Sequence, residues 1–175
     1  MNKVTQAIEN DSIAALKSLM KEGIDLNKPL VVGEEYDLEE YDEITPLFYA
    51  IRSHASLALI EMMLENGVNL FQTDADGISA LDTAIKFKHK PFIALCIQKG
   101  FDLNSTKRKS GITPVMLAAC FSDTEMMQML LDAGGKMDIT DAAGMTPVAY
   151  ARKLGQREMQ TFLEERGATQ ALYKE

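Results

Sequence analysis

The sequence predicts an all-α solenoid of stacked helix–turn–helix units joined by β-hairpin-like loops, and two recurring marks support this fold class. A six-residue box recurs as TPLFYA, SALDTA, TPVMLA and TPVAYA, and the boxes begin at Thr45, Ser79, Thr113 and Thr146. Glycines that end a helical pattern recur at Gly67, Gly100, Gly134 and Gly167. Both marks repeat every 33 or 34 residues. Such a period indicates a repeat architecture.

The stretch from Gly111 to Gly134 contains all parts of one unit. Thr113 can cap a first helix, and Pro114 fits the first helical position without losing a hydrogen bond. A polar break at residues 122–124 leads into a second helix, which Gly134 ends in a left-handed conformation. Each helix has about ten residues and is too short to be stable in isolation. The residues expected to hold the stack together are Leu117, Leu130 and Leu131.

Taken in order, five repeats are expected in a single domain of residues 1–175. The first is a degenerate cap, and each of the other four contains one box. Outside the fourth repeat, helices are expected at about 3–9, 12–22, 46–52, 57–66, 91–99, 147–154 and 156–166. The repeats run over about 2–33, 34–77, 78–111, 112–144 and 145–167, and a tail follows at 168–175.

Composition places the chain among globular proteins. Of its 175 residues, 46% are hydrophobic and 25% are charged, which is enough for a sizeable core. Cys96 and Cys120 lie in helical patterns without metal-ligand spacing, so a reducing compartment is expected. The sequence has no run of about 18 apolar residues and no secretion signal, and residues 107–109 are its one compact basic cluster. We therefore expect a cytoplasmic protein that binds neither membranes nor nucleic acid.

The boxes resemble those of the ankyrin repeat, which read T-P-L-H-x-A at a period of 33 residues. The resemblance covers residues 2–167, and the final Ala of the box is present in all five repeats. The His position differs, because it holds Phe48, Asp82, Met116 and Ala149. In the family this His links neighbouring boxes by hydrogen bonds. Its absence implies weaker polar ties between the repeats.

The first loop carries an insertion of about ten residues, within residues 31–43, that is strongly acidic. Seven acids and no base lie between positions 34 and 43, so this segment holds seven of the eight net negative charges of the chain. Tyr36 and Tyr41 lie among them. One interpretation is a solvated loop that like charges keep extended. The other is a finger in which the tyrosines anchor a basic partner and the carboxylates steer its approach.

The residues that could carry catalysis are few. His54 and His89 fall in the breaks between helices, which face solvent in the family and hold no partnered nucleophile. Asp74 and Asp76 precede Gly77 in a pattern typical of a β-turn, where Asp accepts hydrogen bonds from its own backbone. The sequence has no calcium loop and no phosphate-binding glycine loop. We therefore expect no enzyme, no cofactor and no metal.

The resemblance implies that the loop tips and first helices line a concave, partner-binding face. At two positions of this face the family usually has polar residues, but this sequence has apolar ones. The first row, directly before each box, consists of Ile44, Ile78, Ile112 and Met145. The second row, eight residues after each box start, consists of Phe87, Phe121 and Leu154, with Ser53 in the second repeat. An apolar patch with a polar rim marks an interaction site. Packing as core is the alternative for both rows, and for the phenylalanines we prefer binding.

The sequence therefore predicts a monomeric, non-enzymatic module that binds a protein with a basic patch and an apolar knob. The residues expected to contact it are Tyr36, Glu39, Glu40, Tyr41, Asp42, Ile44, Arg52, Asp76, Ile78, Lys86, Phe87, Ile112, Phe121, Met145, Lys153 and Leu154. One alternative is an inhibitor that occludes a basic toxin or nuclease, as an immunity protein would. Another is a scaffold or host-directed effector.

Overall fold

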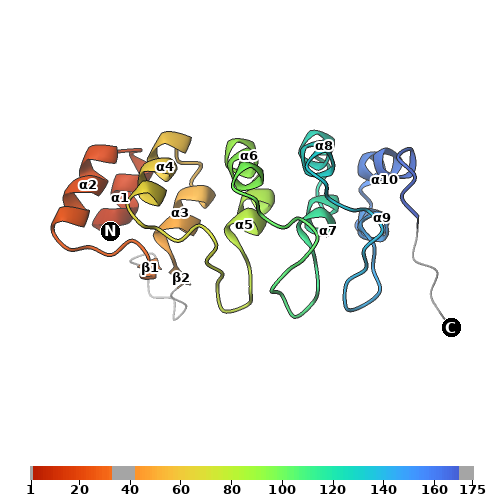
Figure 1. The fold of residues 1–175 in the computed structure, drawn as a ribbon, viewed down its shortest axis with the longest axis horizontal. Helices are drawn as coiled ribbons and strands as arrows, with labels where there is room; N and C mark the ends of the chain where they lie inside the picture. Colours follow the sequence, from red (N-terminus) through yellow and green to blue (C-terminus); the bar gives the residue numbers. More distant parts are fainter. Residues whose placement is uncertain (1, 33–41, 170–175) are drawn as a thin grey trace. The chain divides into compact units, whose positions relative to one another are not determined.

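The computed structural model describes residues 2–32 and 42–169 of the chain (Figure 1). It divides into two compact units, unit 1 (residues 1–72) and unit 2 (residues 73–175), which we describe separately. The helices of unit 1 are α1 (Lys3–Glu9), α2 (Ile13–Lys21), α3 (Pro46–Arg52) and α4 (Leu57–Glu65). Those of unit 2 are α5 (Ala80–Lys86), α6 (Lys90–Gln98), α7 (Pro114–Ala119), α8 (Thr124–Asp132), α9 (Pro147–Lys153) and α10 (Arg157–Glu164). The predicted all-α fold of helix pairs is confirmed, whereas a single domain over residues 1–175 stays a prediction.

The helices begin and end where the sequence pattern places them. The Thr113 hydroxyl accepts a hydrogen bond from the Met116 amide (3.4 Å), and Pro114 takes the first helical position. At the start of α5 the Ser79 hydroxyl accepts from the Asp82 amide (3.1 Å), and the Asp82 carboxylate accepts from the Ser79 amide (2.9 Å). This reciprocal capping box satisfies donors that a helix N-terminus leaves free. Gly134 follows α8 with a φ of 94°, a conformation that disfavours residues with a side chain.

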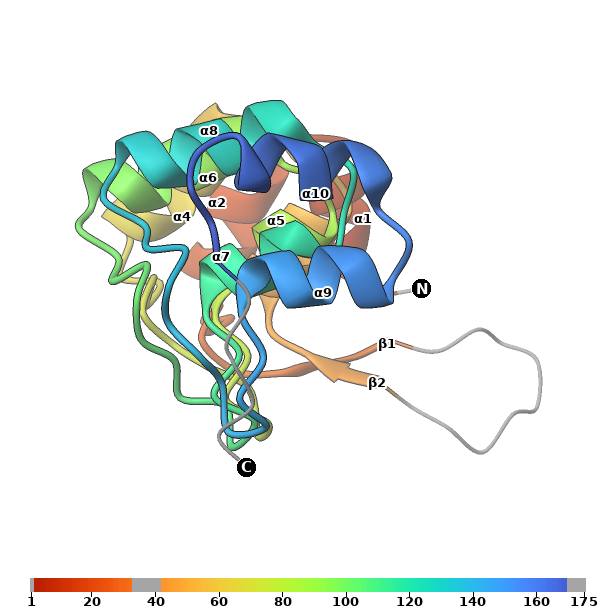
Figure 2. The same cartoon turned by 90° about the vertical axis from the view of Figure 1, so that its right-hand side faces the viewer.

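In unit 2 the six helices form two layers (Figure 1). The inner layer consists of the first helices of the three repeats, α5, α7 and α9, and the outer layer consists of α6, α8 and α10. Figure 2 shows the joining loops extending away from the helices on the side of the inner layer. Leu81, Met116 and Leu130 are completely buried between the layers. Leu117 and Leu131, which were also expected to hold the stack together, are half-buried, so that this expectation stays a prediction for these two.

Unit 1 contains two repeats and a strand pair. Helix α1 packs against α2 and α3, and α3 packs against α4. The acidic insertion leaves and rejoins this unit as an antiparallel ribbon of β1 (Leu30–Val32) and β2 (Asp42–Ile44), in which Leu30 pairs with Ile44 and Val32 with Asp42. The rest of the insertion, residues 33–41, lies outside the described residues. The ribbon fixes where the two ends of the insertion emerge.

In each unit one asparagine side chain connects adjacent repeats by hydrogen bonds. In unit 2 the Asn104 side chain donates to the Gly134 carbonyl (3.0 Å) and accepts from the Lys136 amide (2.8 Å). In unit 1 Asn27 makes the same pair of bonds to the Gly67 carbonyl (3.0 Å) and the Asn69 amide (2.8 Å). Each asparagine therefore satisfies backbone groups just beyond the helix of the next repeat.

We expect Asn104→Ala to lower the free energy of unfolding by about 1–3 kcal/mol, because it leaves a carbonyl and an amide of the next repeat without their partners. Urea denaturation followed by circular dichroism measures the loss. Lys99→Ala is the control, because Lys99 is exposed and caps α6 with its backbone only. An equal loss in both variants would contradict the tie.

Candidate functional site

Two loops of unit 2 contain a turn in which an aspartate side chain accepts hydrogen bonds from backbone amides of the same loop. Asp74 Oδ1 accepts from the amides of Asp76 and Ile78, both at 2.9 Å. Asp141 Oδ1 makes the equivalent bonds one loop later, at 2.9 and 2.8 Å, and the second donor is the amide of Met145. The turn predicted at Asp74 and Asp76 is confirmed, because Asp74 accepts hydrogen bonds from amides of its own loop.

The loop between these two departs from the pattern, because Arg108 stands where the others have aspartate. Its Nε lies 3.5 Å from Oδ2 of Asp82, whose side chain is 3% exposed. Asp82 itself occupies the box position where the family has histidine. An ion pair thus ties the loop before α7 to helix α5, and both residues belong to the third repeat. The two non-consensus charges compensate each other, whereas the expected weakening of polar ties between repeats stays a prediction.

The first apolar row lies directly before the inner helices. Ile78, Ile112 and Met145 are all half-buried, and each precedes the N-cap of its helix. Five residues further along the chain, Leu117 and Tyr150 are half-buried too. A residue before an N-cap often packs against the side chain at this helical position. The first row therefore has the placement of such staples and is neither fully core nor fully exposed.

Tyr150 adds a polar anchor to this face. Its hydroxyl donates to Asp141 Oδ2 at 2.5 Å, so Asp141 holds both the loop turn and the tyrosine. Burial, and then the hydrogen bond to Asp141, raise the pKa of Tyr150 well above its usual value. The phenol thus remains a hydrogen-bond donor at physiological pH, and it fixes the loop against α9.

The second row lies at the C-terminal ends of the inner helices. Phe87 and Phe121 are half-buried, and Leu154 is 51% exposed. The Lys86 Nζ lies 5.6 Å from the centroid of the Phe87 ring, and the Lys88 Nζ lies 5.9 Å from that of Phe121. Ammonium groups at this distance are attracted to the ring faces. The ammonium group of a lysine from the third repeat therefore lies against each ring.

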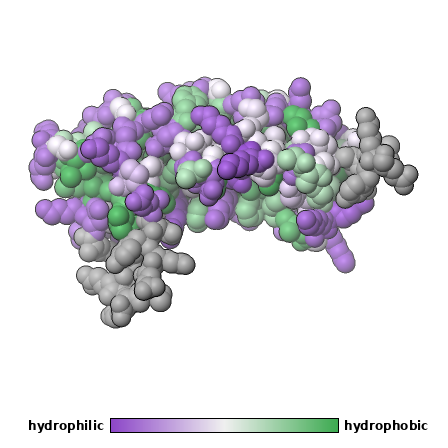
Figure 3. Space-filling model, turned by 90° about the horizontal axis from the view of Figure 1, so that it is seen from below, coloured by the Kyte–Doolittle hydropathy of each residue, from purple (hydrophilic) through white to green (hydrophobic). Residues whose placement is uncertain are grey.

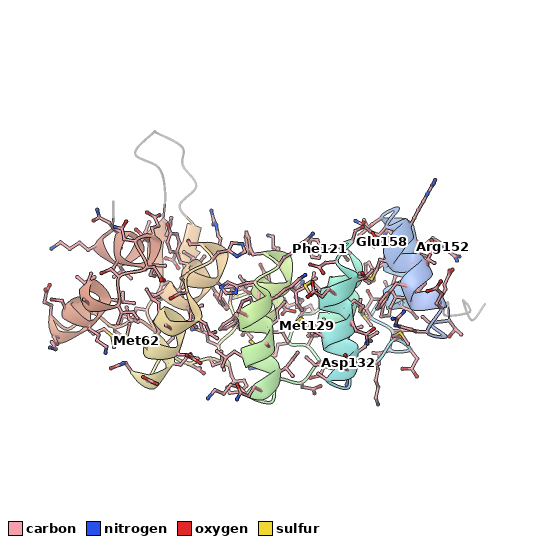
Figure 4. All side chains as sticks on the ribbon, turned by 90° about the horizontal axis from the view of Figure 1, so that it is seen from above. Met62, Phe121, Met129, Asp132, Arg152 and Glu158 are labelled. Atoms are coloured by element: carbon pink, nitrogen blue, oxygen red, sulfur yellow. The ribbon has the colours of Figure 1, made fainter. Side chains whose placement is uncertain are left out.

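The labelled side chains show where this row lies in unit 2. In Figure 4, Phe121 and Arg152 lie toward one edge, and Asp132 lies toward the opposite edge at the far end of α8. Seen from the side of the loop tips, unit 2 shows hydrophilic side chains with hydrophobic areas among them (Figure 3). The predicted site residues Asp76, Lys86 and Lys153 are exposed.

The predicted site residues of unit 1 are placed less completely. Ile44 is half-buried in β2, Arg52 is exposed in the last turn of α3, and Asp42 is described only as a member of β2. The remaining predicted residues, Tyr36, Glu39, Glu40 and Tyr41, lie outside the described residues. Whether any of these residues contacts a partner stays a prediction.

The histidines and cysteines do not form a reactive site. His89 is buried, and its Nδ1 accepts the Phe92 amide at 3.3 Å as the N-cap of α6, so the expectation that it faces solvent is wrong. His54 is exposed, as expected. Burial raises the pKa of the Cys96 thiol, and burial outweighs the opposing charge of Arg108 to raise that of Cys120. Both thiols are therefore poor nucleophiles.

Two further kinds of site are absent from the described part of the chain. No group of three or more His, Cys, Asp or Glu side chains there could hold a metal ion. None of the helices of residues 2–32 and 42–169 is long and apolar enough to span a bilayer.

Sequence reasoning missed three residues of the inner face of unit 2, which are Lys88, Arg108 and Tyr150. The sequence contains a signal for Arg108. Arg108 replaces the aspartate of its loop, and Asp82, in the same repeat, replaces the box histidine. For Tyr150 the signal is an aromatic residue five positions after Met145, on the face that the staple marks. For Lys88 no pattern indicated that its chain would reach the ring of the following repeat.

Comparison with known proteins identifies relatives of this fold. A family model described as ankyrin repeats in three copies matches residues 4–107 and 91–172. The chain is 32% identical over 124 residues to the E3 ubiquitin-protein ligase Ufd4 of Drosophila melanogaster, which is 69% of the chain and 4% of that protein. It is 30% identical over 95 residues to the NF-kappa-B inhibitor cactus of Drosophila melanogaster, 53% of the chain and 19% of that protein.

A bacterial relative is Protein PhlB of Serratia liquefaciens, which is 28% identical over 115 residues, 66% of the chain and 50% of that protein. The chain therefore spans half or less of the length of each of these three relatives. The similarity concerns the repeats and does not extend to the whole of any of these proteins.

We expect Arg108→Met to lower the free energy of unfolding by about 3 kcal/mol, because it leaves the buried Asp82 carboxylate without its cation. The double variant Asp82→His with Arg108→Asp gives the box position the family's histidine and the loop position the aspartate of the neighbouring loops, and should recover most of this loss. Urea denaturation of the two variants and the parent protein measures both effects. A cost below about 0.5 kcal/mol for the single variant would show that the pair is not a structural tie.

Proposed function

Because the chain belongs to the ankyrin repeat family, whose repeats form protein–protein interaction modules, we propose that its inner face binds a partner protein and catalyses no reaction. The observation that carries this proposal is the second row. Phe87, Phe121 and Leu154 lie outside the six-residue boxes, and their apolar side chains are partly exposed to solvent. Aromatic residues that are partly exposed and surrounded by polar groups are typical anchors of interfaces.

The acidic insertion gives the proposed module a second contact. Its net charge of −7 over ten residues would attract a basic surface over about a Debye length and raise the association rate. The ribbon of β1 and β2 supports this role, because it gives both ends of the insertion a defined exit from unit 1. In this proposal Tyr36 and Tyr41 anchor the partner and the carboxylates select it.

An inhibitor of a basic toxin or nuclease is the second candidate function. The concentrated acidity of residues 34–43 favours it, because many basic enzymes bind polyanionic substrates that such a segment could mimic. One relative, cactus, is by name an inhibitor of another protein. A scaffold or host-directed effector is the third candidate, and no particular residue favours it.

Enzymatic activity is not part of the proposal. Ufd4 is by name a ligase, but the similarity covers only 4% of that protein. The buried thiols and the capping role of His89 also leave the described residues without an activated nucleophile. We further propose that the protein is cytoplasmic and is a monomer when free.

We expect the double variant Phe87→Ala with Phe121→Ala to weaken partner binding at least ten-fold, which corresponds to about 1.4 kcal/mol. Its free energy of unfolding should fall by less than about 2 kcal/mol, because half-buried rings contribute less than the 3–5 kcal/mol lost with fully buried ones. Proteins cross-linked to the intact chain identify the partner, and calorimetry with the purified partner gives the affinities.

Phe162→Ala is the matched control. Phe162 is also a half-buried ring under a cation, with Arg166 at 3.5 Å, but it lies on the outer helix α10. This variant should retain full binding. A double variant that loses stability like a core mutant while it binds normally would contradict the proposed site.

We expect replacement of the seven insertion acids by Asn and Gln to slow association and to flatten its dependence on salt, because long-range attraction is lost. Surface plasmon resonance from low to high salt measures both. The control replaces Glu61, Glu65 and Glu158, which are exposed acids of outer helices. Equal association rates for the parent and the seven-fold variant would exclude steering by the insertion. If the partner is an enzyme, loss of its activity on adding this protein selects the inhibitor function.

A further inference from the structure

We propose that the second row of unit 2 receives an acidic amphipathic helix of the partner, with apolar side chains seven residues apart and carboxylates beside them. This inference rests on the proposed function and names the chemistry of the segment that the inner face binds. It differs from the basic patch expected opposite the insertion, because it concerns unit 2 only.

The apolar part of the argument is the repetition of one position. Phe87, Phe121 and Leu154 follow the last turns of α5, α7 and α9, and these helices pack side by side. Packed helices lie about 8–10 Å apart, so the row offers three apolar rungs at about that spacing. A partner that contacts all three must present apolar groups at the same interval on one face.

An α-helix meets this requirement better than an extended strand. Seven helical residues rise about 10.5 Å and complete nearly two turns, so residues i, i+7 and i+14 lie on one face at the right spacing. Three residues of an extended strand also span about 10 Å, but side chains three apart point to opposite faces. The segment that fits is therefore a helix that crosses the inner layer.

The electrostatic part of the argument is the set of cations around the row. Lys86 and Lys88 lie against the two rings, and Lys153 precedes Leu154 and is exposed. In the part of the chain that the structure describes, no carboxylate is within ion-pair distance of any of these three lysines. Asp123 forms its ion pair with Lys90, at 3.2 Å, and Lys88 attracts the Asp123 carboxylate only over a longer distance.

The carboxylates of the same face are largely withdrawn from solvent. From the turn of each loop to the end of each inner helix, residues 74–88, 108–122 and 141–155 contain six basic and four acidic residues. Asp82 is 3% exposed and pairs with Arg108, and Asp141 is 9% exposed and bonds Tyr150. The two exposed acids, Asp74 and Asp76, lie in a loop turn. The charge that a segment meets at the row is therefore positive.

The test selects ligands for the intact chain from a displayed library of random 20-residue peptides. We expect the enriched peptides to be acidic and helical, with Leu, Ile, Phe or Met at seven-residue intervals. Each of Lys86→Glu, Lys88→Glu and Lys153→Glu should weaken their binding about ten-fold, since each turns an attraction into a repulsion. Lys99→Glu, at an exposed lysine after the outer helix α6, should change it less than two-fold.

The outcomes separate this inference from the proposed function. Enriched peptides that lose binding with Phe87→Ala and Phe121→Ala, but are neutral or basic or ignore the lysine reversals, would overturn the acidic helix and leave the binding face intact. Peptides that ignore the phenylalanine variant, or a library without enriched peptides, would overturn the docking surface itself. Acidic peptides without the seven-residue interval would overturn the helical geometry.

Discussion

The brevity of the helices is the constraint on which the rest of the structure depends. In the described residues no helix is longer than nine residues, and helices of this length are not stable in water by themselves. Each must bury one side against its neighbours, and this requirement fixes the box, the caps and the glycine stops. Ties such as those of Asn104 then hold the loops in the register that the packed helices impose.

Burial decreases at the C-terminal end of the inner helices. In α5, Leu81, Ala84 and Ile85 are completely buried, whereas Lys86 is exposed and Phe87 is half-buried. Apolar residues that recur at this position in three repeats are the basis of the proposed binding row.

Much of the fold could be predicted from the sequence because two marks, the six-residue box and the glycine stop, recur at the same period and together locate the repeats. The helices predicted at residues 3–9 and 46–52 are found at Lys3–Glu9 and Pro46–Arg52, and the others with predicted bounds differ by one or two residues at their ends. Side-chain environments were harder to predict, because they depend on how the helices and loops pack. His89 becomes the buried cap of its own helix α6, and the Arg108 side chain reaches back from its loop to Asp82 of α5. In the candidate site, the positions of the two apolar rows could be predicted from the repeat period. The lysine at the Phe121 ring could not, because Lys88 belongs to the preceding repeat.

The distribution of charge differs between the two units. Unit 1 carries the whole net charge of −8, nearly all of it in the insertion, and unit 2 is neutral overall with cations gathered at its apolar row. Juxtaposing like charges at an interface costs several kcal/mol, so a segment suited to one unit is rejected by the other. Under the proposals made above, a partner that contacts both units carries a basic surface for the insertion and an acidic helix for the row. A uniformly basic protein would then suit only the insertion, and a uniformly acidic protein only the row.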